Sequence, residues 1–282
     1  MATLIQSLQN VLANKDPLLG NETKRIILKE ALQAYTLGFL YNHPIYRGLN
    51  FYGGTCLHVI YDLNRFSEDI DLDNSAGIDI SPLERDLRTY FRTNVGYPEI
   101  TTKNQQGEWG VQRITLKFPV LNALGLSPSP NEALHLKVEI SQHQQTAIIR
   151  KTPVFLSGHS LVASHFSLET MMAGKIIACL ERNFKKGSEG INIKGRDFYD
   201  LLWFMQQKIQ PLEEKLEKDG NQPYTLSTAM MLLYEKVATI KTSDLAVDLL
   251  PLFEQRSFIE AWLETFHQNF ERFVSNYRSD LS

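Results

Sequence analysis

Cysteine is scarce in this chain, and the usual signature of a zinc site is missing. Only Cys56 and Cys179 occur among 282 residues, each inside an apolar pattern of helical spacing and not in a CxxC pair. We therefore expect both to be reduced residues of the core. The seven histidines are scattered without HExxH or comparable ligand spacing, which argues against zinc.

The chain also lacks long apolar runs and a strong charge of either sign. No stretch of about eighteen apolar residues occurs, and the first residues lack the regions of a secretory signal. We expect a cytoplasmic protein without membrane contact. The formal net charge of -3 gives no global positive field, so that any contact with nucleic acid must be local.

The chain does contain mixed helix and strand patterns first and helical patterns afterwards. We expect an α+β protein, with a mixed β-sheet and flanking helices over residues 1–160 and a helical domain over 161–282. The predicted N-caps are Asn21, Thr55 and Ser81. The predicted strands lie near 69–73, 99–102, 111–118 and 134–141. The predicted helices lie near 22–41, 55–63, 167–183, 196–208, 224–239 and 257–276, with a further helix starting at 81–84.

Aspartates alternate along the predicted strand 69–73. Residues i and i+2 of a strand share a face, so Asp69 and Asp71 project together. Two such carboxylates, about 6–7 Å apart along the backbone, repel each other unless a cation such as Mg²⁺ or Mn²⁺ lies between them. Glu139 joins this face if its strand is a neighbour. The alternative is an edge strand whose aspartates only face water.

A glycine pair precedes the helix that leads to these aspartates. Gly53 and Gly54 allow close approach to the backbone, and the start of a helix offers N–H groups to phosphate. The alternative is a tight turn from strand to helix without a ligand. Because a phosphate cradle and a metal pair would lie only one short helix apart, we favour the functional interpretation.

The stretch from Gly53 to Leu72 resembles the first motif of the AbiEii/AbiGii nucleotidyltransferase-like toxin family, within the DNA polymerase β type nucleotidyltransferase superfamily. It consists of Gly-Gly-Thr, a helix, and Arg-x-Ser-x-Asp-hydrophobic-Asp. The segment 137–141, Lys-Val-Glu-Ile-Ser, is similar to the second strand motif of the family, with glutamate where aspartate is frequent. Later segments around Lys175 and Asp197 are similar to its lysine and Arg-Asp-x-Tyr-Asp-Leu motifs, so the resemblance covers about residues 45 to 205.

The resemblance implies a nucleotidyltransferase that moves a nucleoside monophosphate from an NTP to an acceptor hydroxyl. It implies a type IV toxin acting on RNA, with the tRNA 3′ end as the expected acceptor and a transcriptional regulator as its antitoxin. The implied catalytic residues are Asp69, Asp71, Glu139, Lys175 and Asp197, of which Asp69, Asp71 and Glu139 bind metal. The implied nucleotide contacts are Gly53, Gly54, Thr55, Arg65 and Ser67.

The helical pattern supports two of these residues independently. Lys175 falls on the apolar stripe of its predicted helix, where a lysine must snorkel or find an anion. It could contact triphosphate or accept a proton, or its stem could only cover the edge of the core. Asp197 faces inward and could orient Lys175 or the acceptor, or only stabilise the start of a helix.

Further basic residues do not decide which molecule accepts the nucleotide. A local patch could grip RNA phosphates, or could be a solvated helix end: Arg182, Lys185, Lys186, Lys194 and Arg196. Arg196 and Asp200 could form only an ion pair between helices, and Lys137 could only neutralise Glu139. The alternatives to RNA transfer are a protein or small-molecule acceptor and an NTP-binding module without catalysis.

Overall fold

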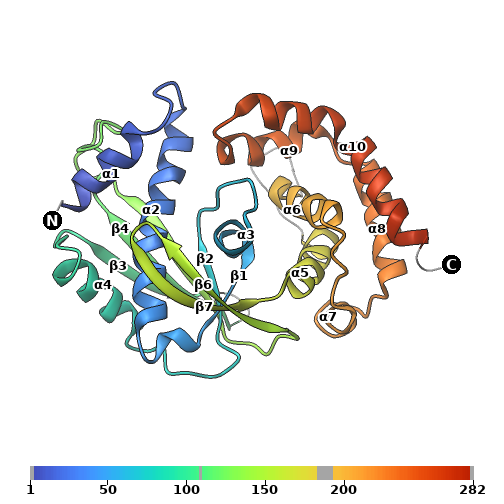
Figure 1. Cartoon of the computed structure of the whole chain (residues 1–282), viewed down its shortest axis with the longest axis horizontal. Helices are drawn as coiled ribbons and strands as arrows, with labels where there is room; N and C mark the ends of the chain where they lie inside the picture. Colours follow the sequence, from blue (N-terminus) through green and yellow to red (C-terminus); the bar gives the residue numbers. More distant parts are fainter. Residues whose placement is uncertain (1–2, 108–109, 183–192, 280–282) are drawn as a thin grey trace. The chain divides into compact units, whose positions relative to one another are not determined.

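A computed structural model describes residues 3–107, 110–182 and 193–279 (Figure 1). The chain divides into two compact units. The first comprises Met1–Gln144 and Ile149–His165, and the second comprises Gln145–Ile148 and Phe166–Ser282. Each unit is described by itself below.

The first unit is built on a mixed seven-stranded sheet in the order β3-β4-β5-β2-β1-β7-β6. Its strands are β1 (Asn50–Tyr52), β2 (Ile70–Asp73), β3 (Thr101–Gln106), β4 (Gln112–Phe118), β5 (Leu134–Ser141), β6 (Ile149–Leu156) and β7 (His159–Phe166). Its helices are α1 (Leu4–Ala13), α2 (Asn21–Asn42), α3 (Gly53–Tyr61) and α4 (Leu83–Thr93), with a 3₁₀ turn η1 at Tyr46–Gly48. Figure 1 shows α2 and α4 on one face of the sheet and α3 on the other.

The central strands alternate between apolar and polar residues, and this pattern sets which face enters the core. Ile70 and Leu72 of β2 and Val138 and Ile140 of β5 are fully buried. β2 pairs in parallel with β5 and antiparallel with β1. Since successive side chains of a strand point to opposite faces, the acidic residues between these apolar ones share the other face. The expected α+β class with a mixed sheet is confirmed.

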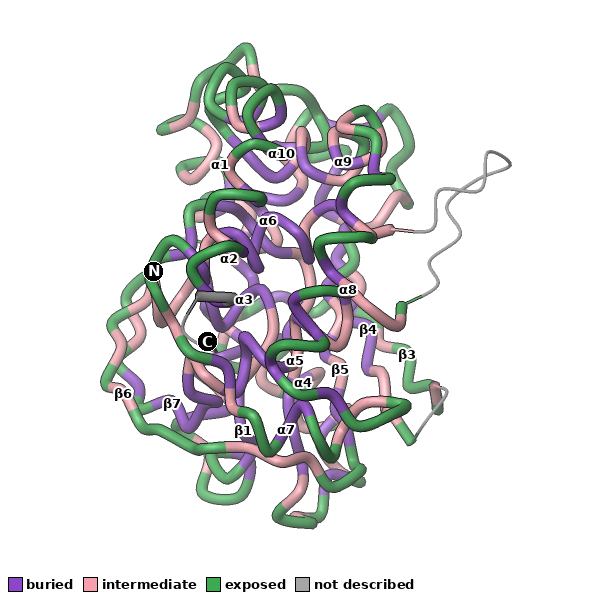
Figure 2. The backbone as a smooth tube through the Cα atoms, turned by 90° about the vertical axis from the view of Figure 1, so that its right-hand side faces the viewer, coloured by how far each residue is buried: buried purple, intermediate pink, exposed green. Residues whose placement is uncertain are grey.

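The second unit is helical. Its elements are α5 (Leu168–Glu181), α6 (Gly195–Gln206), α7 (Glu213–Lys218), α8 (Leu226–Ala238), α9 (Thr242–Leu249), the 3₁₀ turn η3 (Leu250–Leu252) and α10 (Arg256–Ser279). Helix α6 is its most deeply buried element and appears largely purple in Figure 2. The segment 145–148 is anchored to this unit, because Thr146 donates hydrogen bonds to Asp219, which also pairs with the buried Lys215 at 2.5 Å.

Three predicted helix caps are wrong, each for a local reason. Asn21 is the first residue of α2, and its N-cap is Gly20. Thr55 lies inside α3, which starts two residues earlier at Gly53, and its hydroxyl instead donates to the backbone carbonyl of Asp69, just before β2. Ser81 precedes the N-cap of α4 and donates its N–H to Asp79.

The hairpin β6–β7 is absent from the predicted elements. No residue of β6 is buried and β7 holds polar residues among apolar ones, so neither gives a strong strand pattern. The strand predicted at 99–102 begins later and continues to Gln106. Cys56 and Cys179 are buried and free, as expected. In the described part of the chain, no helix is long and apolar enough to span a membrane.

Candidate functional site

The carboxylates predicted from the strand pattern meet on one face of the first unit. Asp71 of β2 stands directly opposite Glu139 of β5 in a parallel register. Neighbouring strands lie about 4.8 Å apart, so these two side chains start side by side. Asp69 precedes β2, and its side chain is 26% exposed, close to the 25% of Glu139. We call Asp69, Asp71 and Glu139 the carboxylate face.

Basic side chains stand against this face. Lys137 Nζ lies 3.9 Å from Asp69 Oδ1, and Arg113 Nε lies 2.6 Å from Glu139 Oε1. Arg113 reaches Glu139 because β4 pairs with β5 at that position. Both cations are more than one-third exposed, so water screens these pairs and they can open at low cost.

The donor set suits a hard divalent cation. Carboxylate oxygens are the ligands that Mg²⁺ and Mn²⁺ prefer, and the pairing of β2 with β5 brings the donors from two adjacent strands. Among residues 3–107, 110–182 and 193–279, no three histidine, cysteine or acidic side chains are already gathered tightly enough to hold a metal ion. Glu139 would have to turn from Arg113 to complete a three-carboxylate set.

The start of α3 is fitted against the carboxylate face. Gly53 has a φ of +77°, and a Cβ added there would lie 2.2 Å from Oδ2 of Asp71. Only glycine suits this position, because a side chain would be strained in the backbone and would strike the carboxylate. A Cβ on Gly54 would lie 2.7 Å from Nη2 of Arg65 and 2.8 Å from Oγ of Ser67. The predicted motif is therefore packed together in space.

The remaining residues of the motif are buried and form hydrogen bonds that support the glycine turn. Thr55 is fully buried and donates its hydroxyl to the backbone carbonyl of Asp69. Arg65 is 3% exposed and donates to the carbonyl of Phe66 at 2.8 Å, while the carbonyl of Ser67 accepts from Gln33 at 2.9 Å. These contacts hold the segment before β2 against the start of α3.

Two neighbours of the face are structural. Asp73 is buried and accepts hydrogen bonds from Asn50 at 3.1 Å and from the hydroxyl of Ser75 at 2.6 Å, so it fixes the turn after β2. Burial, with a smaller contribution from Asp71, raises the pKa of the Cys56 thiol well above its ordinary value. Cys56 is therefore a neutral core residue and not a nucleophile.

The second unit contains a compact cluster of opposite charges between α5 and α6. Lys175 Nζ lies 2.6 Å from Asp197 Oδ1 and 2.8 Å from Asp200 Oδ2. Arg182 donates to the other oxygen of Asp197 at 2.6 Å. The side chain of Lys175 is 15% exposed, that of Asp197 4% and that of Asp200 0%. We call these four residues the lysine–aspartate cluster.

Nearby positive charges keep the carboxylate of Asp197 ionised. Burial by itself raises the pKa of Asp197, but Lys175 and Arg182 together outweigh it and hold that pKa below its usual range. Burial raises the pKa of the nearby Cys179 thiol well above its ordinary value. The carboxylate of Asp197 therefore remains charged at neutral pH beside a neutral thiol.

Two members of these groups do not stand out in the sequence pattern. The pattern allows Asp200 an ion pair between helices, and Asp200 does pair with Lys175 of α5. No local pattern singles out Arg113, because its contact with Glu139 depends on strand register. Arg182 was assigned to a basic patch, and here its guanidinium binds Asp197. Lys185 and Lys186 of that patch lie outside the described residues.

Comparisons with known proteins agree with the sequence motif. A family model described as "Nucleotidyl transferase AbiEii toxin, Type IV TA system" matches residues 40–281. A crystal structure from H. pylori, provisionally assigned as a nucleotidyltransferase, shares 20% sequence identity, with a TM-score of 0.51 over 90% of this chain and 94% of that one. At this identity the likeness concerns the fold alone.

A second solved structure and the curated proteins were also compared with the chain. An antigenic nucleotidyltransferase-like protein from Paracoccidioides brasiliensis shares 20% identity, with a TM-score of 0.39 over 83% of this chain and 96% of that one. The comparison with curated proteins found no match. The family model covers most of the chain, including the carboxylate face and the lysine–aspartate cluster. The chain belongs to the AbiEii nucleotidyltransferase toxin family of type IV toxin–antitoxin systems.

Proposed function

We propose that the protein transfers a nucleoside monophosphate from an NTP to an acceptor hydroxyl and releases pyrophosphate. The observation that carries this proposal is the contact of the glycine turn with the carboxylate face. Gly53 leaves room for Asp71 at the very start of α3, where backbone N–H groups attract phosphate. A site for the triphosphate and a site for divalent cations therefore adjoin in one motif.

Asp69 and Asp71, with Glu139 when it leaves Arg113, would hold Mg²⁺ or Mn²⁺. Such an ion, when bound, neutralises the charge of the triphosphate and of the departing pyrophosphate. Gly53 and Gly54 offer the backbone to phosphate, and Thr55, Arg65 and Ser67 support the turn. The chain's own contribution is positioning and charge stabilisation, as in phosphoryl transfer generally.

We propose that Lys175 and Asp197 serve the same reaction. The ammonium group of Lys175 is held by two carboxylates, and such fixed positive charge suits a triphosphate contact better than proton acceptance. Asp197 is positioned to orient Lys175, because it contacts both that ammonium and Arg182. Neither role needs a covalent nucleophile.

For the acceptor, we propose RNA, at the 3′ end of tRNA, and a cytoplasmic place of action. Family membership supports this choice, because its members are toxins of type IV systems. The net charge of -3 supplies no general attraction to RNA, so a protein or small-molecule hydroxyl is the second candidate. The antitoxin would be a transcriptional regulator encoded with the toxin.

The test is incubation of the protein with each labelled NTP, Mg²⁺ and total tRNA, beside the double variant Asp69→Asn/Asp71→Asn. We expect label in RNA with the wild type only. Parallel reactions with protein extract and with small metabolites separate the alternative acceptors. If the wild type binds NTP but labels none of the three, the transfer proposal is wrong and a silent binding role replaces it.

A further inference from the structure

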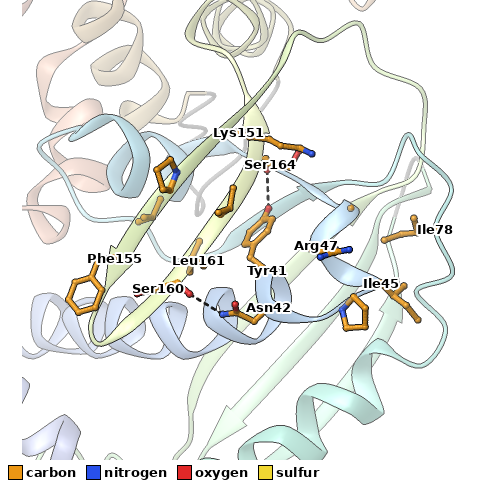
Figure 3. A pocket seen from close by; sticks show the side chains of 15 residues that line it. Tyr41, Asn42, Ile45, Arg47, Ile78, Lys151, Phe155, Ser160, Leu161 and Ser164 are labelled. Atoms are coloured by element: carbon orange, nitrogen blue, oxygen red, sulfur yellow. Dashed lines mark hydrogen bonds between the residues drawn. The ribbon is translucent and has the colours of Figure 1, made fainter.

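The first unit has a groove that the proposed reaction does not use. It has a volume of about 1240 Å³ and lies between the C-terminal part of α2 with η1 and the hairpin β6–β7 (Figure 3). Its lining includes Gly48 and Ser164, which lie near the start of β1: Ser164 donates to Asn50 at 2.8 Å. The glycine turn follows the other end of β1, about 10 Å along the strand. The groove is therefore separate from the carboxylate face.

The walls of this groove are largely apolar and open. Phe155 of β6 is 75% exposed, Val162 of β7 54% and Ile45 47%. Pockets for small molecules usually measure about 300–1000 Å³ and enclose most of the ligand. A larger hollow whose apolar side chains stand so far in water suits an extended polypeptide better than a small ligand.

The hairpin β6–β7 forms one wall of the groove. Lys151, Pro153 and Phe155, spaced by two residues on β6, line it together with Val154. β6 is the last strand of the sheet order, so its outer side has no neighbouring strand among the described residues. Pro153 lacks an N–H, which discourages continuous strand addition and favours docking across the face.

The charge of the groove is of one sign. Its charged lining residues are Arg47 and Lys151, and no acidic side chain of the described residues lines it. Arg47 and Lys151 are exposed, and neither forms an ion pair within the described part of the chain. Figure 3 shows both on the groove, with Phe155 at its other end. Two available cations and an apolar wall are complementary to carboxylates followed by apolar side chains.

We propose that this groove docks a protein partner through an acidic segment that carries apolar side chains. RNA fits less well, because a backbone track needs a row of cations and several stacking aromatic rings. The groove offers two cations and one strongly exposed ring, among seven aliphatic or proline side chains: Pro44, Ile45, Ile78, Pro153, Val154, Leu161 and Val162. This proposal does not depend on the proposed reaction.

The test is selection of a random peptide display library on the immobilised full-length protein. We expect enrichment of peptides that combine Asp or Glu with aliphatic or aromatic residues. Synthetic versions of these peptides should bind at least about tenfold more weakly to Phe155→Ser and to Arg47→Ala/Lys151→Ala. Leu18→Ser is the control: Leu18 is an apolar side chain outside the groove that is 90% exposed, and its change should leave peptide binding unchanged.

Several results would overturn the docking proposal. Failure to enrich any peptide, a basic consensus, or equal binding to the groove variants would each contradict it. Oligouridine that binds the wild type and not the groove variants would assign the groove to RNA. Dimerisation in sedimentation that Phe155→Ser abolishes would assign it to a second copy. Both groove variants should retain nucleotide transfer, because the groove is separate from the carboxylate face. If the wild type itself shows no nucleotide transfer, only the proposed reaction is rejected, and the docking proposal stands or falls on the peptide binding.

Discussion

The two groups of charged residues in this molecule are built in opposite ways. On the carboxylate face, acids and bases are partly exposed, and its closest pairs involve Arg113 and Lys137, which are 41% and 44% exposed. In the lysine–aspartate cluster, Asp197 and Asp200 are almost completely buried and Lys175 lies between them. The first group can exchange partners, and the second is fixed by its surroundings.

This difference in exposure implies different roles for the two groups. Exposed ion pairs are worth about 0–1 kcal/mol, so a ligand can displace them. Breaking a buried ion pair by removing one partner costs about 3–5 kcal/mol, because a charge is left without compensation. We therefore expect changes on the carboxylate face to affect ligand binding and rate, and changes in the cluster to affect folding stability as well.

The largest expected effect comes from the carboxylates themselves. Asp69→Asn/Asp71→Asn should lower nucleotide transfer by a factor on the order of 10³, because the fixed charges that hold the cation are lost. Unfolding in urea should change by less than about 1 kcal/mol, since both side chains lie at the edge of solvent. A large loss of stability would contradict the contrast between the two groups.

Lys175→Met should lower the free energy of unfolding by about 3 kcal/mol, because Asp197 and Asp200 then lack their shared cation. Urea unfolding followed by tryptophan fluorescence, to which Trp203 and Trp262 of the second unit contribute, measures this loss. Lys215→Met is the matched control, since the side chain of Lys215 is also largely buried, at 6% exposed, and pairs with Asp219. Both variants should lose stability, and only Lys175→Met should lose transfer in its folded fraction.

Gly53→Ala tests the contact between the glycine turn and Asp71. We expect a loss of transfer on the order of 10²-fold, because the new methyl group would displace the carboxylate. Gly77→Ala is the control: Gly77 also has a positive φ, of +66°, but a Cβ there meets open space. Both variants should lose about 1–2 kcal/mol of stability. Equal rates of nucleotide transfer by the two variants would show that Gly53 has no special role in the site.

Arg113→Gln should strengthen the binding of Mn²⁺ by about two- to fivefold, because Glu139 loses a competing partner and a nearby positive charge is removed. Electron paramagnetic resonance of free Mn²⁺ measures this affinity without reference to activity. Arg88→Gln, which opens a similarly exposed pair with Glu84, should leave the affinity unchanged. Weaker binding by Arg113→Gln would mean that Glu139 needs Arg113 to face the metal.

The smallest expected change concerns pH. The pKa of Asp197 is lower in the folded protein than in the unfolded chain. Its carboxylate therefore stabilises the fold at any pH above the unfolded pKa, and this stabilisation is lost as the pH falls through the folded pKa. The difference in unfolding free energy between wild type and Asp197→Asn should thus be constant from about pH 8 to 5 and shrink below about pH 4. A difference that grows on acidification would contradict the assigned direction.

Short-range patterns in the sequence were sufficient for the strands that carry the site. The alternation of Asp69 to Asp73 and of Leu134 to Ser141 predicted β2 and β5 nearly to the residue. The inward direction of Lys175 and Asp197 also followed from helical spacing, and both side chains are largely buried. These features depend only on periods of two and 3.6 residues.

Contacts that depend on register or on exact helix starts could not be predicted. The pairing of Arg113 with Glu139 requires the alignment of β4 with β5. The contact of Asp200 with Lys175 depends on how α5 packs against α6, which no local pattern indicates. The groove was not found at all, because the strands β6 and β7 have weak patterns and its residues come from three separate segments.

The most direct test of the central claim compares two positions of label in the same NTP. The wild type is incubated with Mg²⁺ and tRNA, and the NTP carries label on either its α- or its γ-phosphate. Our account predicts α-label in the RNA and γ-label in released pyrophosphate, with neither transfer in Asp69→Asn/Asp71→Asn. Transfer of the γ-label to the acceptor, or α-label in RNA with the double variant, would contradict nucleotidyl transfer at the carboxylate face.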